Sequence, residues 1–364
     1  MRNFAKLLFQ RVVIVSLCLL VQLGVLFLLL LRFSEYFPWY KAFVTVLSLV
    51  LTLFIVSGRA DPAYKLAWII PILALPLFGV ALYLILGNSR HAGRHQKNIR
   101  RIENAMQEHL KQDPAILDRL QLENSMAGTQ AHYLLTKANC PIYINTATEY
   151  FPSGEACYER MLEDLRGARR TIYLEYFIIQ RGEMWDAMLE ILKEKAAQGL
   201  DIRVIYDDFG CVTKLPARYA SYLEKRGIRC RSFNPFIPIV SPRLNNRDHR
   251  KFLLVDGKIG YTGGINLADE YINATHPYGH WKDCGIRMDG DAVFSMTVMF
   301  LSMWDMIRRT LPQELLPPAA DIHEERGYVQ PFTDYPLDDE AVSETVFLNM
   351  ISRAKRSVYI MTPY

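Results

Sequence analysis

The chain has 364 residues, 51% of them apolar, and a formal net charge of +4 at neutral pH. This length allows two or three domains, each able to bury a core, and the charge is too small to predict nucleic-acid binding by itself. Six cysteines are scattered without a Cys-x-x-Cys pair. Their spacing argues against a zinc site and a disulfide framework, and favours reduced thiols that face the cytosol.

Three long apolar runs occupy the first 88 residues, at about 12–31, 37–56 and 66–86. The first run is long enough to cross the hydrocarbon of a bilayer, too long for the core of a signal peptide, and not followed by a small-residue cleavage site. Aromatic residues flank the second run, and Pro71 and Pro76 interrupt the third, which neighbouring helices tolerate in a membrane. The sequence therefore predicts a membrane anchor over 1–88 with three transmembrane helices.

A basic stretch follows the third run. Residues 88–101 hold five Lys or Arg and no acid, so we expect them to attract anionic lipid head groups at about 1 kcal/mol per charge. The alternative is that they act only as a topology signal. Arg2, Lys6 and Arg11 favour a cytoplasmic N-terminus, and three spans cannot place both clusters on one side. We weight the denser cluster more heavily, which predicts a multi-pass protein of the cell membrane whose soluble part is cytoplasmic.

The soluble part begins with a polar helical pattern in which Pro114 and Gly128 act as breakers, so 89–138 is predicted to be a basic juxtamembrane and helical connector. Helical and strand patterns then alternate. The helical ones lie at 155–166 and 185–197, and the strands at 171–179, 201–206, 228–233 and 252–255. This alternation predicts an α/β lobe over 139–315, with helices covering a mixed sheet.

The sequence also contains a partial internal repeat at an offset of 186 residues. Residues 168–174 match 354–360, and Met161, Leu162 and Leu165 match Phe347, Leu348 and Ile351. Each copy predicts an amphipathic helix, a basic turn and a strand, although two generic helix–strand units would also match by chance. Because the second copy stops after its first strand, 316–364 is expected to be the start of a duplicated, incomplete second lobe.

One short segment of the first lobe carries the residues expected for chemistry. His249 and Lys251 lie two apart on a predicted strand, so their side chains point the same way. A neutral imidazole is a competent nucleophile, and a lysine beside it stabilises phosphoryl oxygens as they gain charge. This chemistry needs no metal and no cofactor.

The residues that follow predict a hairpin. Asp256 and Gly257 are a turn signal, and the return strand at 259–262 leads into Gly263-Gly264, where the backbone can approach a ligand closely. The amide of Asn266 lies just beyond. A strand–turn–strand with incidental polar ends is the alternative interpretation.

Together these residues carry a family resemblance. His249-x-Lys251, four residues and Asp256, followed by Gly-Gly-x-Asn266, resembles the signature of the phospholipase D superfamily. The segments that resemble bacterial cardiolipin synthases are 59–68, 76–79, 82–87, 173–177 and 279–283. The resemblance covers nearly the whole chain.

The resemblance implies roles for individual residues. In such enzymes two lobes each donate a His–Lys pair to one site, where one histidine forms a covalent phosphatidyl intermediate and the other protonates the leaving glycerol. His249 would be either of these. Lys251 and Asn266 would bind phosphate beside the turn at Gly264, and Asp256 would be the acid of the motif, catalytic or structural.

Three further roles are implied in the same way. Glu175 and Asp283 would orient His249 or its neighbours, and His280 would line the substrate entrance. Three pairs of residues have side chains of the kinds that bind metals, and for each pair another interpretation is favoured. His91 and His95 belong to the basic stretch, Pro277 and Gly279 prevent a rigid helix through His276 and His280, and Asp207-Asp208 is expected to be a strand-end loop.

The sequence departs from the family in one respect. The complete pattern, with Asp after four residues, occurs once, so half of the shared site is missing and the chain alone is expected to be inactive. The expected reaction is phosphatidyl transfer between two phosphatidylglycerol molecules, with membrane and anionic phospholipid as partners rather than nucleic acid, and self-association through an exposed lobe surface. A phospholipase-D-type hydrolase, an inert truncated chain and a homodimer of one-motif lobes remain alternatives.

Overall fold

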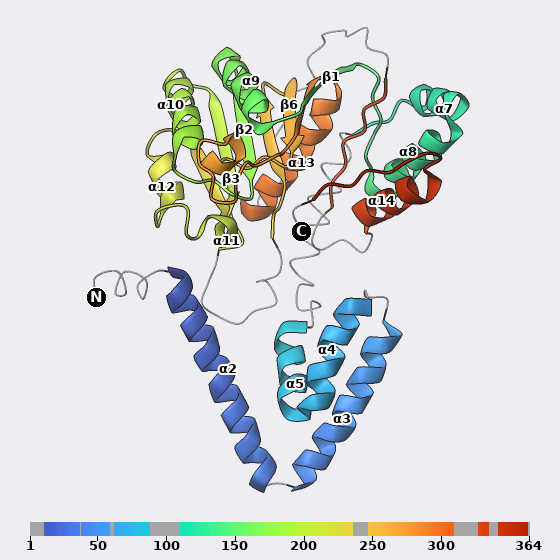
Figure 1. Ribbon diagram of the computed structural model, residues 1–364, viewed down its shortest axis with the longest axis vertical. Coiled ribbons are helices and arrows are strands. Elements are labelled where there is room, and N and C mark those ends of the chain that lie inside the picture. The colour runs from blue at the N-terminus through green and yellow to red at the C-terminus, as the bar shows by residue number, and fades with distance from the viewer. Residues whose placement is uncertain are drawn as a thin grey trace. The chain divides into compact units, whose positions relative to one another are not determined.

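The computed structural model describes residues 11–36, 38–58, 62–87, 110–235, 247–308, 327–334 and 341–362. They fall into two compact units (Figure 1). The smaller unit contains the helices of the first 94 residues, and the larger one contains the sheet and its helices. The basic stretch, including His91 and His95, lies outside the described residues.

The helical unit follows the three apolar runs of the sequence. Its elements are α2 (Arg11–Tyr36), α3 (Pro38–Ser57), α4 (Pro62–Ala74), α5 (Pro76–Leu82) and the π-turn η1 (Tyr83–Gly87). Pro71 lies inside α4, whereas the chain bends at Leu75 because Pro76 has no N–H with which to continue the helix. Over the described residues no helix has both the length and the apolar character needed to cross a bilayer, so the three predicted spans are not confirmed.

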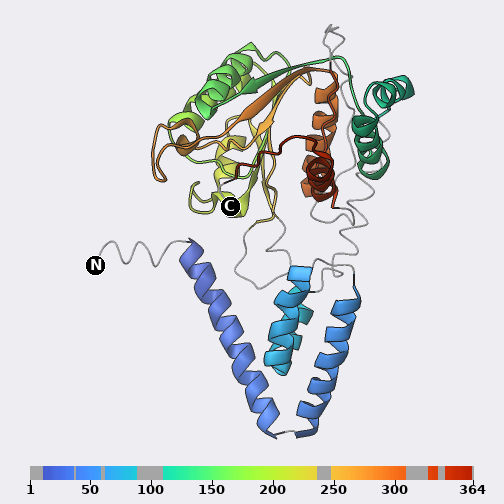
Figure 2. The ribbon, with the colours of Figure 1, turned by 45° about the vertical axis from the view of Figure 1, so that its right-hand side comes forward.

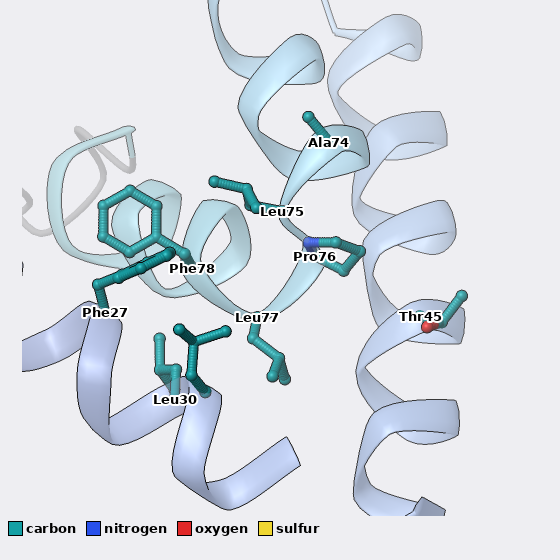
Figure 3. Close-up of a pocket in the computed structure, with 9 residues that line it drawn as sticks. Phe27, Leu30, Thr45, Ala74, Leu75, Pro76, Leu77 and Phe78 are labelled. Carbon is teal, nitrogen blue, oxygen red and sulfur yellow. The ribbon is translucent and has the colours of Figure 1, made fainter. Parts of the chain in front are cut away.

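An apolar pocket of about 200 Å³ lies at this bend (Figure 3). Leu75, Pro76 and Phe78 line it from the bend, Phe27 from α2 and Thr45 from α3. The rings of Phe27 and Phe78 meet edge to face at 5.6 Å. The bend therefore brings α5 against α2 and leaves an apolar space beside that contact.

The larger unit contains a seven-stranded mixed sheet. Its strands are β1 (Thr146–Phe151), β2 (Thr171–Tyr176), β3 (Asp201–Asp207), β4 (Arg229–Phe233), β5 (Lys251–Val255), β6 (Ile259–Gly263) and β7 (Gly285–Gly290). The order is β1-β7-β6-β5-β2-β3-β4, with β2, β3 and β4 parallel and the other pairs antiparallel. This confirms the predicted α/β class with a mixed sheet, and it places β5 at the centre.

Helices cover both faces of the sheet (Figure 2). The helices of one face are α9 (Gly154–Gly167), α10 (Glu183–Ala197) and α12 (Tyr219–Glu224), and the other face packs against α13 (Ala292–Arg308). Two short helices, α11 (Asp208–Cys211) and η4 (Asp269–Ile272), complete the lobe. Alternate residues of β5 point to opposite faces, so Leu253 packs with the α9 side and Phe252 with the α13 side.

The described part of the predicted connector is a folded piece of the lobe. It forms α7 (Pro114–Glu123) and α8 (Ser125–Ala138), and Leu134 of α8 joins the core around α13. Pro114 begins a helix, as its fixed φ favours. Gly128 does not end one: it lies inside α8, where an added Cβ would be 2.7 Å from the Gln121 backbone. The expectation that Gly128 breaks the helix is wrong, because close packing of α7 on α8 requires a glycine there.

The second copy of the repeat forms its helix but no strand. The helix is α14 (Val342–Arg353), which packs beside α8 and buries Val342 and Val346. Residues 357–360 are exposed and not in a strand. A strand needs a hydrogen-bonded neighbour, and no described strand lies beside this segment. The predicted second lobe is therefore represented by one helix among the described residues.

Candidate active site

His249 and Lys251 lie together at the start of the central strand. Lys251 is the first residue of β5, opposite Tyr176 of β2. Its Nζ lies 3.4 Å from Nδ1 of His249 and donates a 2.7 Å hydrogen bond to the His249 carbonyl oxygen. The structure thus brings the two predicted side chains into contact.

The surroundings of this pair set its protonation. Lys251 is buried, and burial lowers its pKa to about 8 against the opposing charges of Asp248 and Asp283. His249 is exposed enough to meet a substrate, yet partial burial and then the Lys251 charge lower its pKa, with Asp248 opposing. At neutral pH the site therefore presents a neutral imidazole beside a cation, which suits nucleophilic attack on a phosphoryl group.

An aromatic ring supports the imidazole. Phe177, directly after β2, has its ring centroid 4.8 Å from that of His249 and 5.9 Å from Nζ of Lys251. Phe177 lies in one of the segments that resemble the family, but no role was predicted for it. The sequence feature that could have indicated its role is an aromatic residue directly after a predicted buried strand.

Glu175 lies on the other face of the sheet. It is fully buried and forms a 2.6 Å ion pair with Nη2 of Arg250, the residue between His249 and Lys251. Burial raises the pKa of Glu175 well above its usual range, with Arg250 opposing and Asp248 adding to the rise. Glu175 therefore contacts a neighbour of His249, not His249 itself.

The amide of Asn266 joins two loops. It is buried, its Oδ1 accepts a hydrogen bond from the Ile178 N–H at 3.0 Å, and its Nδ2 donates to the Tyr271 hydroxyl at 2.8 Å. The phosphate contact expected of this amide stays a prediction. Gly264 leaves room for the Asp283 side chain, because a Cβ there would be 2.1 Å from Oδ1 of Asp283.

Asp283 faces the pair from the loop before β7. Its Oδ2 accepts a 3.2 Å hydrogen bond from the Trp281 indole, and its charge raises the pKa of Lys251. His280 is exposed on the same loop. Asp283 is therefore placed to act on Lys251, and the role of His280 at an entrance stays a prediction.

Asp256 lies at the opposite end of β5, five residues from Lys251 and hence about 17 Å away along the strand. Its carboxylate accepts hydrogen bonds from the backbone N–H groups of Arg169, Arg170 and Thr171 at 2.9, 2.7 and 2.8 Å. Its φ of 55° begins the hairpin turn. The structure gives Asp256 a supporting position and does not bring it to His249.

The strand-end acids have a structural position as well. Asp207 is buried, and its carboxylate accepts hydrogen bonds from the N–H groups of Phe209, Gly210 and Asp248. Asp207 ends β3 and caps α11, which begins at Asp208, so the two acids lie at a strand–helix junction and the expected strand-end loop is wrong. Within the described ranges, no group of three His, Cys, Asp or Glu side chains is arranged to hold a metal ion.

Two segments match known families. Residues 161–278 match the family described as "Cardiolipin synthase, PLD-like domain", and residues 44–88 match the one described as "Phospholipase_D-nuclease N-terminal". The first match includes most of the sheet and the His249–Lys251 pair, and the second lies in the helical unit.

Individual relatives match over most of the chain. An uncharacterized protein of Streptococcus mutans is 39% identical over 316 residues, covering 86% of this chain and 68% of that protein. The cardiolipin synthase of Geobacillus thermodenitrificans is 30% identical (87% and 64% covered), and that of Alkalihalophilus pseudofirmus is 31% identical (88% and 66% covered). The chain spans about two thirds of the length of these relatives.

Proposed function

Because this chain belongs to the cardiolipin synthase family of phospholipase-D-like proteins, we propose that it supplies a His–Lys pair for phosphatidyl transfer between two phosphatidylglycerol molecules, giving cardiolipin and glycerol. The contact between the exposed His249 and the buried Lys251 carries this proposal. It joins a nucleophile or acid to a fixed cation, which is one of the two halves that displacement at phosphorus requires.

The proposed reaction has two displacements. First, a histidine nitrogen bonds to phosphorus, the bond from phosphorus to the terminal glycerol oxygen breaks, and an acid on the opposite side gives that oxygen a proton. Second, the hydroxyl of another phosphatidylglycerol gives its proton to the same group and attacks phosphorus, releasing the histidine. Lys251 stabilises the charge on the phosphoryl oxygens in both steps. His249 takes either histidine role, and a second His–Lys pair takes the other.

We also propose that the protein acts on anionic phospholipid at the cell membrane as a multi-pass protein, with its catalytic unit on the cytoplasmic side. The apolar runs of the first 88 residues and the basic stretch after them support this. The region that matches the "Phospholipase_D-nuclease N-terminal" family, 44–88, contains the third apolar run and most of the second.

Self-association is part of the proposal. Phe347, Leu348, Met350 and Ile351 of α14 are 46–61% exposed although they are large and apolar. Such a surface favours contact with a second apolar surface, and a second copy of the chain would bring a second His249. A homodimer of one-motif lobes is therefore the alternative route to a two-histidine site.

The test is transfer in vesicles. The protein is reconstituted, alone and with a segment that supplies a second His–Lys pair, in vesicles of phosphatidylglycerol labelled in its terminal glycerol. Cardiolipin, phosphatidic acid and free glycerol are measured, with His249→Gln as control, and the chain alone is expected to give no cardiolipin. Cardiolipin with released glycerol supports transfer. Phosphatidic acid in its place identifies a hydrolase, and equal product from the His249→Gln variant refutes the assignment of His249.

A further inference from the structure

A cluster of buried charges lies behind the His249–Lys251 pair. Glu175, Asp248 and Arg250 have side chains that are 0%, 2% and 12% exposed. Arg250 contacts both acids, through Nη2 to Oε1 of Glu175 at 2.6 Å and through Nε to Oδ1 of Asp248 at 3.2 Å. Because Asp248 and Arg250 flank His249 in the sequence, any change in the cluster acts directly on the catalytic strand.

The cluster has an imbalance of charge. Two carboxylates face one guanidinium, in a place where an uncompensated charge is costly. Oε2 of Glu175 and Oδ2 of Asp248 are buried and have no hydrogen-bond partner within the described part of the chain. Carboxylates only accept hydrogen bonds, so these oxygens gain a partner when one of the two acids carries a proton.

The surroundings indicate which acid carries it. The cross-strand neighbours of Glu175 are Ile205 and Phe252, both apolar, and burial is the main cause that raises the pKa of Glu175. Asp248 instead accepts hydrogen bonds from the N–H and Nε of Arg250. Donors stabilise the ionised form of Asp248, and none of this kind reaches Oε2 of Glu175.

Other charged groups on this face have partners of their own. Arg203 and Arg231 lie over the Trp304 ring and form ion pairs with Asp201 and Glu224. Asp207 accepts backbone hydrogen bonds, one of them from the N–H of Asp248. On α13, Asp305 is buried and has a partner as well. Arg203, Arg231 and Asp207 thus have partners outside the cluster of Glu175 and Arg250.

We propose that Glu175 is a protonated carboxylic acid that donates a hydrogen bond to Asp248, and that the Asp248 carboxylate, held by Arg250, acts together with Asp283 as a fixed negative charge that keeps Lys251 cationic. Asp248 is a positioning residue in this arrangement, since its charge raises the pKa of both Lys251 and His249. The first half of the proposal concerns the fold alone. The second half rests on the proposed phosphatidyl transfer.

Two isosteric substitutions in the full chain separate the acids. Glu175→Gln imitates the protonated form, whereas Asp248→Asn removes the charge. Glu175 has a pKa raised above its unfolded value, so its burial costs stability increasingly as pH rises above the unfolded value of about 4.3. Thermal unfolding from pH 5 to pH 9 should show a falling midpoint in the parent chain, and Glu175→Gln should flatten that slope. An unchanged slope overturns the assignment of the proton to Glu175.

The second measurement is the pH profile of transfer. Asp248→Asn should move the alkaline limb, set by Lys251, to lower pH by about one unit or more, and Glu175→Gln should leave its position unchanged. A shift with Glu175→Gln and none with Asp248→Asn would place the charge on Glu175 and overturn the proposal. If no transfer is seen even when a second His–Lys pair is supplied with the chain, the proposed function fails, while the unfolding experiment still decides the state of Glu175.

Discussion

Replacing Asp256 by Asn tests whether this aspartate supports the fold or takes part in the reaction. The Asp256 carboxylate accepts three backbone N–H hydrogen bonds from Arg169, Arg170 and Thr171. An asparagine keeps an oxygen for Arg170 and Thr171, which share Oδ1, but places an N–H against the N–H of Arg169. It also tolerates the positive φ of 55° at this position. The change therefore loses one charge-assisted hydrogen bond and weakens two.

We expect a loss of about 1–2 kcal/mol, since the group is partly exposed and water replaces part of what is lost. For a unit of this size that lowers the unfolding midpoint by about 2–8 °C. Transfer by the folded protein should stay within a few fold of the parent, because His249 lies at the other end of β5. His249→Ala is the matched control, with an unchanged midpoint and no transfer. A thousandfold loss of transfer by Asp256→Asn at an unchanged midpoint would refute this reasoning.

The remaining predictions concern the pair, its pH dependence and two surfaces. Lys251→Ala should lower transfer by about 10²–10³ with little loss of stability, and a chelator should have no effect on transfer. Activity should fall as pH rises through about 8, where Lys251 loses its charge. If the Lys251→Arg variant shows the same fall in activity at the same pH, this prediction is wrong. Neutralising the basic residues of 90–101 should weaken flotation with anionic vesicles, and salt-insensitive binding to neutral ones would contradict it. The double variant Phe347→Glu, Ile351→Glu should associate less than the parent chain in analytical ultracentrifugation. The prediction of self-association is wrong if the parent chain is itself monomeric.

Local patterns in the sequence predicted the elements around the site well. The predicted helices at 155–166 and 185–197 correspond to α9 and α10, and the turn at Asp256-Gly257 joins β5 to β6. These elements have one apolar face or a turn signal, which short-range periodicity reveals. His249 and Lys251 were predictable for the same reason, because a strand places residues two apart on one side.

Elements whose partners are distant in sequence were not predicted. α13 is buried on all sides, so its sequence has no polar face that would reveal a period. β7 contains Arg287, and an arginine in a sequence predicts an exposed position. In the structure Arg287 is buried because it binds Asp164, which is 123 residues away. The three bonds of Asp256 span 85 to 87 residues. Such contacts follow from the order of strands in the sheet, which no local pattern contains.

The two copies of the repeat show that similar local patterns can differ in burial. Met161 and Leu165 of α9 are 2% and 0% exposed, whereas their counterparts Phe347 and Ile351 of α14 are 59% and 46% exposed. The residue types and their spacing are alike, so both segments form a helix. Burial differs because α9 packs on a sheet whose β2 follows it directly, and the corresponding segment 357–360 is not in a strand. An amphipathic pattern therefore determines that a helix forms and which face is apolar, and only the presence of a sheet determines whether that face is buried.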